Sequence, residues 1–122
     1  MTNVKTATSP KKSDLANLER LIGDAVGPSE QIDKEIGLIF DGRQAGEKPV
    51  AYTGSVDECI RLLSRLLPEW HWHVGHGPMG VVPYASMTRN NGEDGSVHME
   101  ASASTVPLAL LGSLIKALRY EN

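Results

Sequence analysis

Cysteine is almost missing from this sequence: Cys59 is the single one in 122 residues. One thiol cannot form an intrachain disulfide, and such scarcity is typical of proteins from reducing compartments. Long apolar runs are missing too, since none approaches the roughly 18–20 residues of a membrane-spanning helix. The opening residues MTNVKTATSPKK contain no apolar segment of the kind that secretory signals require. We therefore expect a cytoplasmic protein that has no membrane contact.

Positive charge is also in short supply. The 12 Lys and Arg residues are outnumbered by 15 Asp and Glu, which gives a net charge of −3, and Lys11-Lys12 is the one basic pair. A mildly acidic chain has no strong attraction to a phosphate backbone, so nucleic-acid binding is disfavoured. Aromatic residues make up only 5% of the chain, and both tryptophans fall in one short stretch, Trp70 to Val74.

The length of 122 residues predicts one domain with one hydrophobic core. Residues 1–12 are polar and carry a Ser-Pro step, so we expect a disordered N-terminal arm. Residues 13–122 are expected to form the folded domain.

Apolar residues that recur every three or four positions predict four helices. Each predicted helix has a residue suited to capping its free N–H groups. The first is capped by Ser13 and ends at Gly27-Pro28, the second is capped by Ser29 and ends at Asp41-Gly42, the third has a capping box at Ser55–Glu58 and ends at Pro68, and the last is capped by Ser104 or Thr105.

Three strands are predicted between the third helix and the last. They cover 70–74, 81–87 and 97–103, and the turn pairs Asn91-Gly92 and Asp94-Gly95 separate the second from the third. Residues 49–53 are a further candidate for an edge strand. The predicted fold is therefore α+β: a single α/β/α sandwich in the order ααα-βββ-α around an antiparallel sheet of three to four strands. Both tryptophans are expected in its core. The last helix and the third helix pack on one face, and the first two helices are available to cover the other.

Several segments of the chain resemble the phage ABA sandwich family, a group of small phage and prophage proteins. The matching segments are Tyr52-Thr53-Gly54-Ser55-Val56-Asp57, then Leu67-Pro68-Glu69-Trp70 before a Trp-x-Trp strand, and Ala103 to Leu110 followed by Ile115 to Arg119. Together with the order of predicted elements, they extend the resemblance over about three quarters of the chain, from Gln31 onward. The resemblance implies helices on both faces of a sheet and a phage or prophage origin. It implies no activity.

Two patterns suggest a metal site: His71-x-His73, and the pair His98 and Glu100. Alternate residues of a strand project from the same face, so His71 and His73 share one. Given a suitable register, His98 and Glu100 of the third strand could join them. Imidazole and carboxylate groups are ligands for zinc or a similar divalent metal. The alternative interpretation is a solvated polar sheet face that carries no metal, because no established ligand spacing such as H-E-x-x-H is present.

Other patterns are explained by structure. Cys59 lies within an apolar helix stripe, where a thiol is inert. The stretch Gly75–Gly80 lacks the residues of a phosphate-binding loop and is predicted to be a turn. No pair of nucleophile and base is visible, so we do not expect an enzyme.

The function predicted from the sequence is that of a phage-encoded accessory protein that binds a host or phage protein stoichiometrically. Inhibition of a host defence is one form that this function takes. The alternative is a small-molecule or metal-binding module that uses the histidine-rich sheet face, and a homo-oligomer is compatible with both. If the first two helices cover that face, the interaction surface is expected in the loops, at His76, Met79, Asn91 and Asp94.

Overall fold

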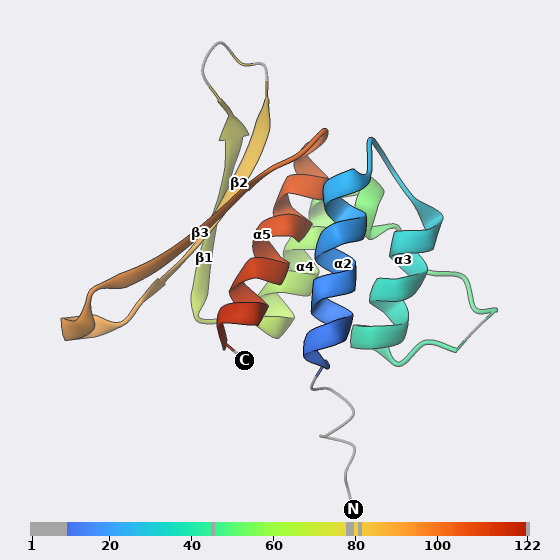
Figure 1. Cartoon of the computed structure of the whole chain (residues 1–122), viewed down its shortest axis with the longest axis horizontal. Helices are drawn as coiled ribbons and strands as arrows, with labels where there is room; N and C mark the ends of the chain where they lie inside the picture. The colour runs from blue at the N-terminus through green and yellow to red at the C-terminus, as the bar shows by residue number, and fades with distance from the viewer. Residues whose placement is uncertain (1–9, 45, 78–79, 81, 122) are drawn as a thin grey trace, which may run out of the picture.

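Four α-helices and a three-stranded antiparallel sheet form the part of the chain that the computed structural model describes, residues 10–44, 46–77, 80 and 82–121 (Figure 1). The predicted α+β class is confirmed. The elements are α2 (Lys12–Asp24), α3 (Glu30–Ile36), α4 (Val56–Leu66), β1 (Trp70–His76), β2 (Pro83–Asn90), β3 (Ser96–Ser102) and α5 (Val106–Glu121). One π-helical turn, Gly37–Asp41, extends α3.

Three of the predicted helix caps are found. The hydroxyls of Ser29 and Ser55 each accept a hydrogen bond of 3.2 Å from the backbone N–H three residues on, and the hydroxyl of Thr105 accepts one of 3.3 Å in the same way. The prediction for the first helix was wrong. It begins at Lys12 with no side-chain cap, so Ser13 already lies within its first turn.

The predicted edge strand at 49–53 was wrong as well. Residues 52–54 form a single 3-10 turn. The backbone N–H of Thr53 donates to Asp33 Oδ1 (2.8 Å), and Thr53 Oγ1 lies 2.9 Å from the same oxygen. These bonds fasten the segment to α3 instead of to the sheet, so within the described residues the sheet has three strands.

All four labelled helices lie on one side of the sheet (Figure 1). Helix α5 packs on β2 and β3, α2 and α4 pack on α5, and α3 packs on α2. The expectation that the first two helices cover the second sheet face is therefore wrong. The reason is that α5 is apolar around most of its circumference, with ten buried residues. It buries one side on the sheet and offers the other to the apolar stripes of α2 and α4.

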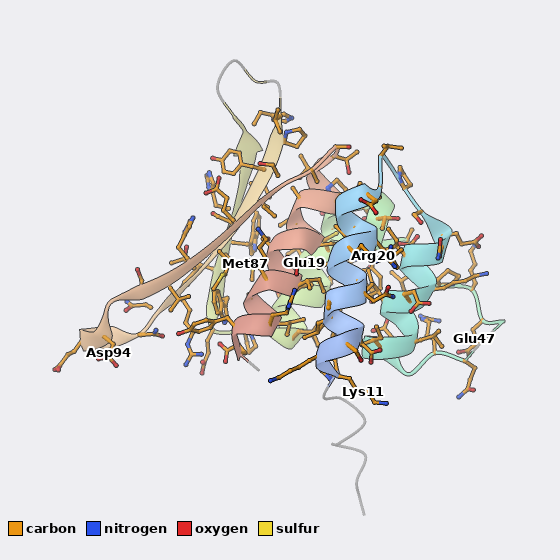
Figure 2. The ribbon with its side chains drawn as sticks, in the orientation of Figure 1. Lys11, Glu19, Arg20, Glu47, Met87 and Asp94 are labelled. Carbon is orange, nitrogen blue, oxygen red and sulfur yellow. The ribbon has the colours of Figure 1, made fainter. Side chains whose placement is uncertain are left out.

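Close contact between α5 and the sheet depends on a small residue. A Cβ atom built on Gly112 would lie 3.1 Å from the Cβ of Ala101 on β3, and Met87 of β2 is fully buried between the layers (Figure 2). Although α5 is apolar, no helix among the described residues has both the length and the apolar character needed to cross a membrane.

The two tryptophans of β1 have different environments, and the prediction that both are core residues was wrong for Trp72. Trp70 is 5% exposed, whereas Trp72 is 41% exposed. Both side chains project toward the helices, but β1 is an edge strand and α5 lies mainly over β2 and β3. Trp72 therefore extends past the helix layer.

Candidate functional site

The sheet face that points away from the helices is the candidate site, and we call it the open face. Residues paired across antiparallel strands project to the same side, so the register defines its members. In rows from one end to the other they are His71, Thr88 and His98; then His73, Ser86 and Glu100; then Gly75, Tyr84 and Ser102. All three histidines and Glu100 are exposed, and Ser86 at the centre is buried among its neighbours.

The central position of β2 determines the distance between the four predicted metal ligands. His71 and His73 lie on β1 and His98 and Glu100 on β3, with Thr88 and Ser86 between them. Two strand spacings separate the two outer strands by about 10 Å. Zinc needs its ligand atoms about 2.0–2.2 Å from the metal. Within the described residues, no group of three or more His, Cys, Asp or Glu side chains is placed to hold a metal ion.

A chain of polar contacts crosses from β2 to β3. Thr88 Oγ1 lies 3.1 Å from His98 Nδ1, and His98 Nε2 lies 3.4 Å from Glu100 Oε1. The order hydroxyl, imidazole, carboxylate is that of a catalytic triad. However, the side chains of His98 and Glu100 are 54% and 55% exposed, so water competes for each of these contacts. The arrangement orients the three side chains on the surface, and it is not the buried setting that activates a nucleophile.

Tyr84 provides the largest ring of the open face. It lies directly opposite Gly75, and a Cβ on Gly75 would lie only 3.1 Å from the tyrosine ring. The missing side chain lets the ring lie across β1, where the hydroxyl is 3.2 Å from His73 Nε2 and the two ring centres are 5.9 Å apart. Tyr84 and His73 thus form one aromatic unit that is supported by a glycine.

A wide, shallow depression of about 850 Å³ occupies one end of the open face. Of the predicted site residues, it brings together His73, His76, His98 and Glu100, and Tyr84 also lines it. His71 is not part of it and lies beside Trp72 and the end of α4.

The other predicted interaction residues lie elsewhere. Asn91 and Asp94 belong to the turn between β2 and β3, which extends beyond the helices (Figure 2). They line a separate depression with Glu69, Arg89 and Tyr120. His76 is at the opposite end of the sheet: it pairs with Pro83, which lies about 27 Å from Asn91 by strand rise. Met79 lies outside the described residues. The structure therefore does not join His76 with Asn91 and Asp94 into one surface.

A further hollow of about 460 Å³ lies between α3 and residues 43–49. Leu38 and Pro49 supply apolar walls, and the rim carries charges of both signs, including Lys34, Glu35 and Arg43. Its lining carries the carboxylates Glu30, Glu35 and Glu47, but no histidine, cysteine or hydroxyl side chain.

Burial raises the pKa of two ionisable groups, Cys59 and Asp33, that lie away from the open face. Burial, with the nearby charges of Asp33 and Glu58, raises the pKa of Cys59 to about 12, and its thiol lies 3.1 Å from the carbonyl oxygen of Tyr52. Burial also raises the pKa of Asp33, although its hydrogen bonds to Thr53 act in the opposite direction. Both groups hold α3, α4 and the turn at 52–54 together.

Sequence reasoning missed Tyr84 as a site residue. Two features of the sequence could have indicated Tyr84: an odd-numbered spacing separates it from Gly75, and it belongs to the alternation of β2. Only the register, however, shows that its side chain is on the same face as the histidines. Comparisons with protein-family models, with curated proteins and with solved structures gave no match.

Proposed function

We propose that this chain is a small accessory protein that binds another protein stoichiometrically through the open face. The observation that supports the proposal best is the one-sided packing of the helices. It leaves a sheet face that carries exposed imidazole and carboxylate groups together with the half-buried Tyr84 and Thr88. A sheet face with no internal partner is rigid and already shaped for contact with another molecule. The resemblance to small phage proteins suggests a host or phage protein as the partner, and inhibition of a host defence as the result.

The chemistry of the open face favours a protein partner over a nucleic acid. None of its residues is Lys or Arg, and Glu100 is its one acidic residue. Such a surface gives no counterion release on a phosphate backbone. Tyr84 is a rigid aromatic side chain with a polar tip, a type that is enriched among residues dominating binding energy at protein interfaces.

The size of the open face limits how the partner is held. Three strands paired over seven residues cover about 14 by 23 Å, or roughly 320 Å² in projection. A standard interface buries about 800 Å² on each side. The partner is therefore expected to extend past the sheet, toward the depression at His76 or the turn at Asn91 and Asp94.

Turnover is not part of the proposal, because the exposed chain of Thr88, His98 and Glu100 is not shielded from water. Stabilisation of a reaction intermediate requires preorganised donors in a site that excludes water. The backbone N–H groups of β2 are already used in the sheet.

Three variants test the proposal. The first replaces His71, His73 and His98 together by Gln, which keeps polarity and removes imidazole chemistry. The second, Thr88→Arg, puts a long charged side chain in the middle of the open face. The control, Gln31→Arg, adds the same charge at an exposed position on α3. Each protein is immobilised at equal density and exposed to host lysate, and bound proteins and bound metal are both quantified.

The expected result is one partner captured at constant stoichiometry by the wild type and by Gln31→Arg, lost with Thr88→Arg, and independent of added chelator. Equal capture by Thr88→Arg and the control would refute the open face as the binding surface. A stoichiometric metal that disappears in the triple Gln variant, together with a measurable reaction, would replace the proposal with the metal-binding alternative.

A further inference from the structure

The outer edge of β1 is a second surface without a partner, and it is distinct from the open face. The sheet order β1-β2-β3 makes β1 an edge strand of seven residues. The bond from Gly77 N–H to the Val82 carbonyl (2.8 Å) continues the β1–β2 register. Because bonding alternates along an antiparallel pair, His71, His73 and Gly75 bond toward β2. Trp72, Val74 and His76 therefore direct their N–H and C=O groups outward.

These outward groups are not used within the described residues. None of the hydrogen bonds outside the sheet ladder involves the backbone of Trp72, Val74 or His76. The N–H of Trp70 is different, because it donates to the Leu67 carbonyl (3.1 Å). The exposed ring of Trp72 lies along the same edge, next to Leu67 and Pro68.

The two edges of the sheet are protected very differently. By the same alternation, Glu100 of β3 directs its carbonyl outward, and Lys116 of α5 donates to it (2.9 Å). Lysine at an edge and covering by a helix are common protections against strand pairing. The sequence of β1, WHWHVGH, has no Lys, Arg, Asp, Glu or Pro. An unprotected edge of this length without charged residues is a template for another strand.

We propose that β1 pairs with β1 of a second copy of this chain, antiparallel and about a two-fold axis at His73. This axis is the one that uses all seven residues of the strand, because it sets Trp70 opposite His76 and Trp72 opposite Val74 of the other copy. The outward groups then meet in hydrogen-bonded pairs, with about six bonds between the chains. The strand has no fixed charge, so self-pairing places no like charges opposite each other.

The self-paired form is an isologous dimer with one continuous six-stranded sheet. The Trp72 ring is then covered by Val74 of the other copy, which accounts for its exposure in the single chain. A strand edge with one large ring supplies less area than a standard interface, so a dissociation constant in the micromolar range is expected. This inference does not depend on the proposed function, because it uses the edge and not the open face.

Sedimentation equilibrium of the full chain tests the dimer. The wild type is expected at twice the mass of one chain at concentrations of tens of micromolar. The variant H73K sets like charges together at the axis and is expected to weaken association at least about tenfold, whereas H98K adds the same charge on β3 and leaves it unchanged. A monomeric wild type, or equal effects of the two variants, would overturn the proposal.

Cross-linking provides a second test that does not depend on weakening the association of the two chains. The native Cys59 is fully buried, so H73C adds one accessible thiol and H98C is its matched control. Paired residues on an antiparallel axis have Cα atoms about 4.5–5.5 Å apart, within the range for a disulfide. Mild oxidation is expected to link H73C into covalent dimers and to leave H98C monomeric. Dimers of H98C alone would show that β3 is the interface, and no dimers of H73C would refute the axis.

Discussion

Replacing the two tryptophans separately gives the sharpest test of the one-sided helix packing. Trp70 and Trp72 lie two positions apart on the same strand and project to the same side, but they are 5% and 41% exposed. If β1 is an edge strand whose far part lies beyond α5, the two substitutions should differ strongly. A sandwich with both rings in the core would make them similar.

The Trp70 side chain has several specific contacts. Its indole N–H donates to Glu121 Oε2 (2.9 Å), and its ring meets Tyr120 edge to face with centres 6.1 Å apart. Arg89 bonds to the same Glu121 oxygen. The indole N–H, and then Arg89, hold the pKa of Glu121 below its usual value. Trp70 thus joins the start of the sheet to the end of α5.

The expected magnitudes follow from burial. Trp70→Ala removes a nearly buried indole and should lower the free energy of unfolding by about 3–5 kcal/mol. Trp70→Phe keeps a ring but removes the indole N–H that donates to Glu121, which retains its bond to Arg89. Loss of a hydrogen bond to a charged group should cost about 1–3 kcal/mol. Trp72→Ala removes a ring that is already partly in water, so about 1–2 kcal/mol is expected.

Urea unfolding measured at low protein concentration, below any self-association, gives these values. Each Trp→Phe variant also leaves a single indole as reporter, so Trp72 should emit like an indole near water and Trp70 like a buried one. The reasoning would be refuted if Trp72→Ala cost as much as Trp70→Ala, or if the two emission spectra were the same.

Three further outcomes follow from the structure. Burial holds the pKa of Asp33 above its ordinary 3.8, so the contribution of this group to stability is complete below pH 3.8 and is lost as pH rises through the raised pKa. The unfolding free energy of Asp33→Asn should therefore increase relative to that of the wild type as pH rises. A difference between the two proteins that stays constant with pH would contradict this. Gly75→Ala places a methyl group against Tyr84; it should displace the ring, remove the Tyr84–His73 contact and cost about 1–3 kcal/mol, as measured by NMR shifts of the histidine and by urea unfolding. With its pKa raised to about 12, the Cys59 thiol should react with a disulfide reagent only after unfolding, and rapid reaction in the native state would place it at the surface.

The sequence alone determined most of the local structure, because local signals arise from neighbouring residues. The exceptions are the cap at Ser13 and the strand at 49–53. The caps at Ser29, Ser55 and Thr105 need only a hydroxyl and the next turn of helix. The alternation along β3 places Val97, Met99 and Ala101 on one face and His98, Glu100 and Ser102 on the other. The apolar stripes predicted the helices. These features depend on contacts within about four residues or on the two-residue period of a strand.

Only the tertiary structure decided how the layers are stacked. An apolar stripe shows that a helix has a buried side, but not whether a sheet or another helix buries it. Because α5 is apolar nearly all round, α2 packs on it and the second sheet face stays open. For the same reason, pattern alone could not distinguish Trp70 from Trp72. Both side chains point to the helix side of the sheet. Their exposure differs because α5 extends over only part of the sheet. The site also depends on how the layers are stacked. The histidines are present in the sequence, but the central position of β2 separates His71 from His98, and the uncovered sheet face leaves both exposed.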